Sequence, residues 1–287
     1  MFGSGRMTDP LVWNVDPVLL HLGPLEIRYY GIFFGFALVT GFLVWNARVR
    51  RFNESAALGE LLLFWGVPAV VIGGRLGYCL FYAPRTYLAD PLRVIAVWDG
   101  GLASHGVAVG LMVALWALSR RFRVPWTRLG DYLAPAVALA VGWVRLGNFF
   151  NSEVIGLPAS VPWAVVFARH DDLPRHPAQL YDLMIGPVTY LVLRAVERRG
   201  VRPIGSGLVA GTFLSVYFGL RILVERYKDF YLEEWREMPP FSTIEGWVGF
   251  PIHTGQWLSV LPFLAGCVLI ARSLRRGESA ARLERTT

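Results

Sequence analysis

The chain has 287 residues, of which 54% are hydrophobic and only 17% are charged, and its formal net charge at pH 7 is +7. Soluble domains carry about 25% charged residues, so the composition excludes an ordinary soluble fold and favours a protein with several membrane helices. The two cysteines, Cys79 and Cys267, lie in apolar runs and form neither a metal-binding nor a disulfide spacing. The N-terminal "MFGSGRMTDPLVWNVDP" lacks the order of a cleavable signal peptide, so the first apolar run is expected to direct insertion.

Seven runs along the chain are apolar and long enough for membrane helices, which need about 20 mostly apolar residues. In chain order these runs are 29–45, 61–82, 102–118, 132–150, 178–196, 205–225 and 255–271. They predict an all-α polytopic membrane protein with seven transmembrane helices, folded as a single integral membrane domain over residues 1–287.

Basic clusters follow every second run, which orients the chain. They read "ARVRR" after the first run, "SRRFRVPWTR" after the third, "ERRGVRP" after the fifth and "RSLRRGESAARLER" after the seventh. Because cytoplasmic loops are rich in Lys and Arg, the N-terminus is predicted outside and the C-terminus in the cytoplasm. The excess positive charge is then a topology signal, and no nucleic-acid partner is expected. Segments 83–101, 151–175 and 226–253 are predicted to form a small external cap.

Polar side chains gather at the outer ends of the predicted helices, whereas the inner halves are nearly bare of charge. In chain order they are Tyr29, Tyr30, Arg75, Tyr78, His105, Arg145, Asn148, Gln179, Tyr181, Asp182, Tyr217, Arg221, Glu225 and Gln256. An Arg at the centre of a membrane helix costs at least about 2.5–3.5 kcal/mol, so these cations should face a bundle interior or a water-filled cavity. Three Arg and one His around an outward-opening cavity predict a site for an anion, and the abundant anion there is a lipid phosphate.

Each of these residues also has a simpler interpretation. A single interfacial Arg is often an anchor whose stem reaches the headgroups, and Glu225 can neutralise Arg221 within one helix. His105 can be a hydrogen-bonded interior histidine. The glycine pairs are interpreted as helix-packing positions, and they are Gly31/Gly35, Gly73/Gly77, Gly106/Gly110 and Gly207/Gly211. The functional interpretation therefore depends on the gathering of polar residues from all seven predicted helices at the same end, and not on any single residue.

The stretch "RLGNFFNSEVIG", which begins at Arg145, resembles the signature of the bacterial phosphatidylglycerol–prolipoprotein diacylglyceryl transferases. Further blocks resemble the same family in the same order: "RYYG", "GGRLGYCLFY", "WDGGLASHG", "RHPAQLYD", "RILVE" and "GQWLS". The resemblance covers nearly the whole chain. Three residues depart from the family pattern beside the expected site: Ser104, Val107 and Val144.

The resemblance implies transfer of the diacylglyceryl group of phosphatidylglycerol to the lipobox cysteine of preprolipoproteins. The reaction forms a thioether and releases glycerol phosphate, at the outer leaflet of the bacterial inner membrane and without a cofactor or metal. Two alternatives stay open: a divergent member that transports anionic lipids, and a non-catalytic lipoprotein-binding protein.

The resemblance and the needs of this chemistry assign roles to individual residues. Arg145 and Arg221 are expected to clamp the phosphate, with Asn148 donating to its oxygens or to the glycerol hydroxyls. His105 is the expected base, with Glu153 or Glu225 as the alternative. The catalytic set is therefore His105, Arg145, Arg221 and Glu225, and the substrate-binding set is Tyr30, Arg75, Tyr78, Asn148, Asn151, Glu153, Gly156, Gln179 and Tyr217.

Overall fold

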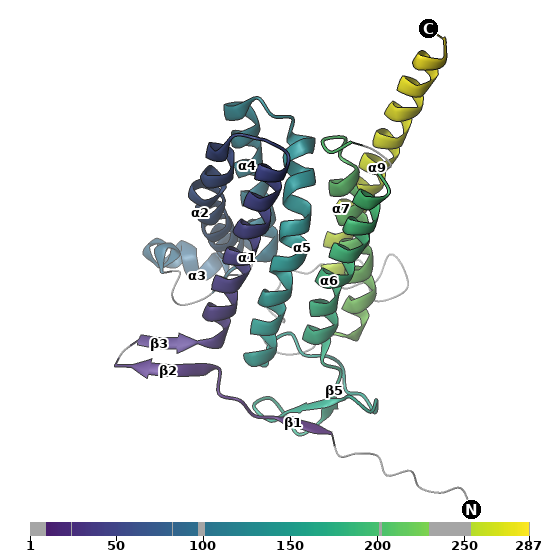
Figure 1. Ribbon diagram of the computed structural model, residues 1–287. Coiled ribbons are helices and arrows are strands. Elements are labelled where there is room, and N and C mark those ends of the chain that lie inside the picture. Colours follow the sequence, from purple (N-terminus) through teal and green to yellow (C-terminus); the bar gives the residue numbers. More distant parts are fainter. Residues whose placement is uncertain are drawn as a thin grey trace, which may run out of the picture.

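The computed structural model describes residues 10–23, 25–81, 83–96, 101–200, 203–229 and 254–286. Within these ranges seven long helices form a bundle (Figure 1). They are α1 (Tyr29–Arg51), α2 (Ala56–Phe81), α4 (Ser104–Phe122), α5 (Trp126–Phe150), α6 (Ala178–Arg198), α7 (Leu208–Val224) and α9 (Thr254–Thr286). Each of the seven predicted runs falls on one of these helices, so the helical class is confirmed.

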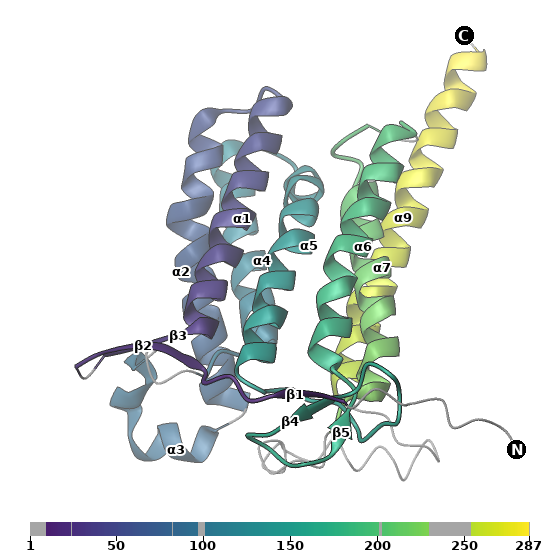
Figure 2. The same ribbon diagram turned by 60° about the horizontal axis from the view of Figure 1, so that its bottom comes forward.

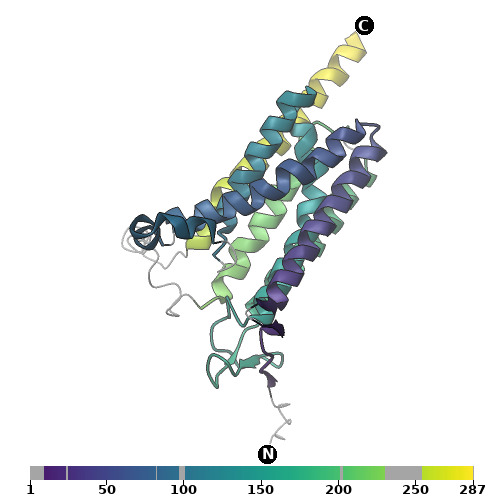
Figure 3. The ribbon, with the colours of Figure 1, turned by 90° about the vertical axis from the view of Figure 1, so that its left-hand side faces the viewer.

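The helices pack in two groups joined through α5. Helix α1 lies along α5 and α2 lies along α4, whereas α7 lies along α9 and α6. Helix α5 contacts α6 and α7 as well, and so it holds the two groups together (Figure 2). The side view shows α1 and α2 close together at the end where the chain connects them and spreading apart toward the other end (Figure 3).

The short elements gather at one end of the bundle, which we call the cap end. It carries strands β1 (Leu11–Trp13), β2 (Val18–Leu22), β3 (Leu25–Arg28), β4 (Val165–Phe167) and β5 (Pro174–Arg175), helix α3 (Pro84–Ala89), and the 3-10 helices η1 (Pro91–Ile95) and η3 (Glu225–Tyr227). Strand β1 pairs in parallel with β4, which pairs antiparallel with β5, and β2 and β3 form a hairpin. The chain is therefore not purely helical, and the residues before the first helix add strands to the predicted cap. Most of the predicted cap segment 226–253 lies outside the described residues.

The opposite end of the bundle, which we call the basic end, carries the Arg-rich connections after α1, α4 and α6 and the C-terminal part of α9 (Figure 1). Among the described residues, five helices are long and apolar enough to cross a membrane: Tyr29–Arg51, Ala56–Leu80, Trp126–Phe150, Leu208–Tyr227 and Gly255–Arg275. The chain is thus a mostly helical protein with several membrane-spanning candidates.

Two of the predicted glycine pairs bring α2 and α4 into backbone contact. A Cβ atom on Gly106 would overlap the carbonyl of Gly73, and one on Gly77 would lie 2.8 Å from the Cα of Gly106. Small residues allow this close approach, as expected for membrane helices. The prediction is wrong for Gly31 and Gly35, because a Cβ on either would meet no described atom within 4 Å.

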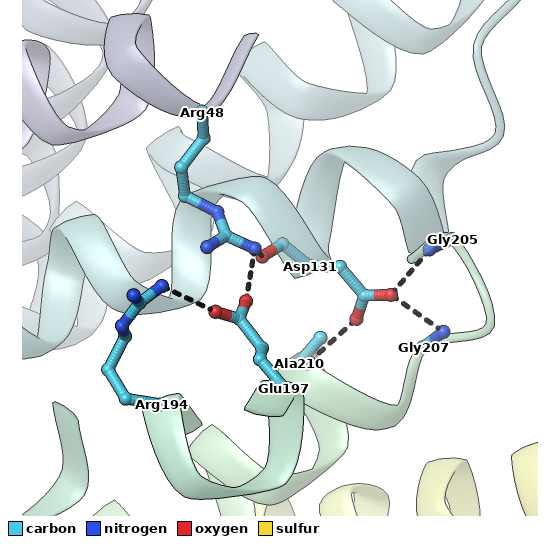
Figure 4. A network of polar contacts seen from close by, with 7 residues as sticks. All are labelled: Arg48, Asp131, Arg194, Glu197, Gly205, Gly207 and Ala210. Atoms are coloured by element: carbon cyan, nitrogen blue, oxygen red, sulfur yellow. Dashed lines mark hydrogen bonds and ion pairs between the residues drawn. The ribbon is translucent and has the colours of Figure 1, made fainter. Parts of the chain in front are cut away.

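A buried polar network joins four helices at the basic end (Figure 4). The Asp131 carboxylate on α5 accepts hydrogen bonds from the backbone N–H groups of Gly205 (2.8 Å), Gly207 (3.1 Å) and Ala210 (2.9 Å), and so it satisfies donors at the start of α7. Arg48 on α1 donates to the Asp131 carbonyl at 3.1 Å and pairs with Glu197 on α6 at 2.5 Å.

This network corrects one expectation, because the inner halves of the helices are not bare of charge. The helices extend beyond the predicted runs at this end: α1 continues to Arg51, α5 starts at Trp126 and α6 ends at Arg198. Arg48, Asp131 and Glu197 lie in those extensions, where Arg48 and Asp131 are buried and Glu197 is 10% exposed, and all three are paired with one another or with backbone groups. Charge at this end is therefore used to tie helices together.

Replacing Asp131 with Ala is expected to lower the free energy of unfolding by about 2–4 kcal/mol, because three buried N–H groups lose their acceptor. The measurement is thermal unfolding in detergent. Asp172→Ala removes an exposed carboxylate and serves as the control, with little expected change. Equal melting temperatures for the two variants would show that the Asp131 bonds do not stabilise the bundle.

Candidate functional site

Arg145 lies in the second-last turn of α5 at the cap end and points toward α6. Its side chain is only 14% exposed, and its Nε lies 3.3 Å from Oδ2 of Asp182, which begins the second turn of α6. Its Nη1 donates a long hydrogen bond of 3.4 Å to Oδ1 of Asn148. A buried guanidinium with a single carboxylate contact keeps N–H donors for a further anion.

Glu153 lies in the turn after α5 and is held by amide groups. Its Oε2 accepts from Asn148 at 3.1 Å and its Oε1 from Asn151 at 2.9 Å, while its carbonyl accepts from Gln179 at 2.7 Å. Both neighbours of Glu153 adopt left-handed backbone, with φ of 54° at Ser152 and 55° at Val154. A β-branched residue such as Val154 rarely adopts this conformation. The turn is therefore strained, and it fixes the position of Glu153.

A second charged group approaches from the end of α7. Lys228 is 3% exposed, and its Nζ lies 2.9 Å from Oδ2 of Asp182 and 2.7 Å from Oε2 of Glu225. Arg221, one turn earlier on α7, lies within electrostatic reach of Asp182. Asp182 therefore links the cation on α5 to the cation after α7, and Oδ1 of Asp182 has no hydrogen-bond partner among the described residues.

Two tyrosines border this cluster. Tyr30, at the start of α1, packs on the backbone of Gly147, where a Cβ atom on the glycine would lie 2.9 Å from the tyrosine ring. Tyr30 also interacts electrostatically with Arg145 and Glu153. Tyr217 is buried on α7, stacks on Phe213 at 5.3 Å between ring centroids and lies within electrostatic reach of Arg145. The structure thus brings together most of the predicted set: Tyr30, Arg145, Asn148, Asn151, Glu153, Gln179, Tyr217, Arg221 and Glu225.

Gly156 has a packing role beside this cluster. Its N–H donates to the His176 carbonyl at 3.0 Å, and a Cβ here would meet the Cβ of His176 at 2.6 Å and the Tyr227 carbonyl at 2.7 Å. The Arg175 guanidinium donates to the Gly156 carbonyl at 3.1 Å and pairs with Asp229 at 2.7 Å. These contacts hold residues 227–229, which include Lys228, against the turn after α5.

Two groups beside these contacts, Asp171 and His176, have shifted pKa values. The Arg175 guanidinium, hydrogen-bonded to Asp171, lowers the pKa of that carboxyl below its usual value, and burial lowers the pKa of His176. The Tyr181 hydroxyl accepts from the Trp163 indole at 2.7 Å and lies 2.9 Å from Nδ1 of His176, and so this hydrogen bond orients the imidazole ring.

The structure does not bring Arg75 and Tyr78 to this cluster. Arg75 is 3% exposed, donates to the carbonyls of Val94 (3.0 Å) and Arg93 (2.7 Å) and lies over the ring of Tyr87. Tyr78 meets Tyr87 edge-on. Both side chains thus fasten α2 to the segment formed by α3 and η1. His105 lies in the first turn of α4, and its side chain falls outside the described residues.

Lys228 was missed by the sequence reasoning, and Asp182 was noted only as a polar residue at its depth. The signal for Lys228 was present, because Arg221, Glu225 and Lys228 follow at i, i+4 and i+7 and so share one helical face. The predicted run ended at 225, so the stripe was cut short. The partner of Asp182 is on another helix, and no spacing in the sequence reveals it.

The described cluster contains three cationic and three carboxylate side chains, from Arg145, Arg221, Lys228, Glu153, Asp182 and Glu225. Because most of these charges are buried or only slightly exposed, each needs a partner there. The N–H donors of the cations can bind a phosphate, and a guanidinium can bind two of its oxygens at once. The arrangement is suited to holding an anionic group and stabilising its charge.

The sequence is similar to known proteins of one family over nearly the whole chain. The family described as prolipoprotein diacylglyceryl transferase matches residues 17–272. A phosphatidylglycerol–prolipoprotein diacylglyceryl transferase of Cupriavidus metallidurans is 37% identical over 277 residues, which cover 92% of this chain and 96% of that protein. Proteins of the same name are 36% identical in Pseudoalteromonas atlantica (93% of this chain, 92% of that protein) and 35% identical in Chloroherpeton thalassium (96% and 98%). This chain belongs to the prolipoprotein diacylglyceryl transferase family.

Proposed function

We propose that the protein transfers the diacylglyceryl group of phosphatidylglycerol to the lipobox cysteine of preprolipoproteins. The observation that carries this proposal is the buried cluster around Arg145 and Asp182, in a chain that matches the transferase family over residues 17–272. The same family match favours a transferase over the lipid-transporter and lipoprotein-binding alternatives.

In the proposed reaction a thiolate sulfur attacks the diacylglyceryl carbon that bears the phosphate oxygen. A C–S bond forms as the C–O bond breaks, and glycerol phosphate leaves with the electron pair. Arg145 and Arg221 hold the phosphate and stabilise the charge that grows on its leaving oxygen. Asp182 sets the direction of Arg145 through its 3.3 Å ion pair. No metal ion or cofactor enters these steps.

The remaining roles are assigned to Asn148, Tyr30, His105, Glu153 and Glu225. Asn148 donates to the phosphate or to the glycerol hydroxyls, and Tyr30 donates from the α1 side of the cluster. His105 takes the thiol proton, which requires a base because a free thiol has a pKa near 8.5. Glu153 and Glu225 contact Asn148, Asn151 and Lys228 rather than a guanidinium, which suits them to ordering the amides and Lys228 around the headgroup.

The direct test combines purified protein, phosphatidylglycerol and a lipobox peptide, followed by mass spectrometry of the peptide. The expected result is one added diacylglyceryl mass on the cysteine. A peptide whose cysteine is replaced by serine is the matched control and should stay unmodified. No mass shift under conditions in which a known transferase works would overturn the proposal.

The proposal also places the protein in the bacterial inner membrane with all seven helices crossing, the cap end outside and the basic end in the cytoplasm. Single cysteines within residues 120–128, around the connection from α4 to α5, or after Arg272, in a protein without Cys79 and Cys267, should resist a membrane-impermeant thiol reagent in intact cells. Cysteines within 151–175 should react. External labelling of the C-terminal tail would contradict this topology.

A further inference from the structure

An apolar groove lies between α1, α2, α4 and α5. Its cavity volume is about 100 Å³, and every residue that lines it is apolar. Gly41 of α1 and Gly66 of α2 contribute no side chain to the lining, and Leu63 of α2, which also lines the groove, is 42% exposed. A Cβ on Gly41 would make ordinary van der Waals contact with the Cβ of Ala140 at 3.7 Å, so a larger side chain at this position extends into the groove.

The surroundings decide what chemistry can fill this groove. Helices α1, α2 and α5 are all long and apolar enough to cross a membrane, and in the topology proposed above the exposed side of the groove faces hydrocarbon. A wholly apolar lining offers no hydrogen bond to a polar ligand or to water. An acyl chain of a lipid is available from the surrounding hydrocarbon and matches the apolar lining of the groove.

Helix geometry connects the groove to the charged cluster. Tyr30, Ala37 and Gly41 are seven and eleven residues apart, which places them on one stripe of α1. At 1.5 Å per residue, Ala37 and Gly41 lie about 10 and 16 Å deeper than Tyr30. Half of the hydrocarbon core is about 15 Å thick, so the groove lies where the acyl chains of an outer-leaflet lipid end.

The α5 side of the groove leads to the same place. Val137, which lines the groove, precedes Asn148 by eleven residues and shares its helical stripe. Asn148 contacts Arg145, and Tyr30 packs on Gly147 between the two stripes. A lipid whose phosphate is held at Arg145 can therefore lay one chain along α1 and α5 into the groove.

We propose that this groove binds the terminal part of one acyl chain of the phosphatidylglycerol donor, and so makes the enzyme sensitive to donor chain length. The proposal rests on the transferase function proposed above. The acyl chain gains packing contacts in the groove. It gains no burial from water, because the bilayer interior that it leaves is equally apolar. A preference for long chains, rather than an absolute requirement, is the expected consequence.

Gly41→Leu fills the groove without touching the charged cluster. Its expected effect is a rise of about 5–30-fold in the KM for dipalmitoyl phosphatidylglycerol at unchanged kcat, because on the order of ten carbon–carbon contacts are lost. The KM for dioctanoyl phosphatidylglycerol should not change, since its chains end before the groove. Gly35→Leu is the matched control, as a Cβ there meets no described atom within 4 Å.

The outcomes separate the groove from the function. If the wild type transfers from both donors and Gly41→Leu affects both equally or neither, the groove proposal is overturned while the function stands. If the wild type transfers from neither donor, the function itself fails. A second measurement uses phosphatidylglycerol with a diazirine at the end of one chain, which should label residues 37–42 or 62–70 in the wild type but not in Gly41→Leu. Equal labelling by a phosphatidylcholine probe would also overturn the proposal.

Discussion

Arg145→Ala is expected to lower the transfer rate by about 10²–10³-fold, the usual cost of removing one donor to the charge of a transition state. The physical reason is that the Arg145 side chain is only 14% exposed and holds its guanidinium beside Asp182 at 3.3 Å, where the phosphate is proposed to bind. Arg145→Lys should recover only part of the rate, because an ammonium lacks the fork that binds two oxygens at once. The same pair of changes at Arg221 should behave alike.

A second variant separates chemistry from folding. Removing Arg145 leaves the three carboxylates of the cluster with two cations, Arg221 and Lys228, among the described residues, which is itself destabilising. The double variant Arg145→Ala/Asp182→Asn removes the excess negative charge. If the double variant regains stability but not activity, Arg145 acts on the substrate. Regained activity in the double variant, or full activity of Lys at both Arg positions, would contradict the clamp. Arg169→Ala, at an exposed cap position, is the control.

His105→Gln is expected to lower the rate by about 10²–10⁴-fold at neutral pH, because Gln keeps a hydrogen-bonding side chain but cannot accept the thiol proton. The variant should still insert, purify and bind phosphatidylglycerol, since the cations at Arg145 and Arg221 are untouched. Raising the pH should rescue it partly, because more of the substrate thiol then ionises without help. The measurement is the pH profile of the rate for the variant and the wild type.

Near-normal rates of a stable His105→Gln protein would remove His105 as the base and turn attention to the carboxylates. The structure gives a reason to rank these second. Both oxygens of Glu153 already accept amide hydrogen bonds, from Asn148 and Asn151, and Oε2 of Glu225 is bonded to Lys228. These hydrogen bonds favour the charged form of each carboxylate and so make it a weaker base.

The sequence by itself determined the helical bundle and the end at which polar residues gather. Runs of about 20 apolar residues have one common structure in a bilayer, since only a helix satisfies its own backbone groups there. The polar stripe of Arg221 and Glu225 and the pair of Arg145 and Asn148 could be predicted because they follow helical spacing within one segment. The prediction placed most of the cluster correctly on those grounds.

Only the tertiary structure decided which side chains contact one another. Asp182 of α6 meets Lys228, which follows η3, and Arg48 of α1 meets Glu197 of α6, at separations along the chain that carry no local signal. Arg75 shows the converse, because its depth suggested the site whereas packing directs it to the carbonyls of Arg93 and Val94. Helical spacing fixes the face on which a residue lies, but a buried charge takes the partner that packing brings within reach, and that choice depends on the whole bundle.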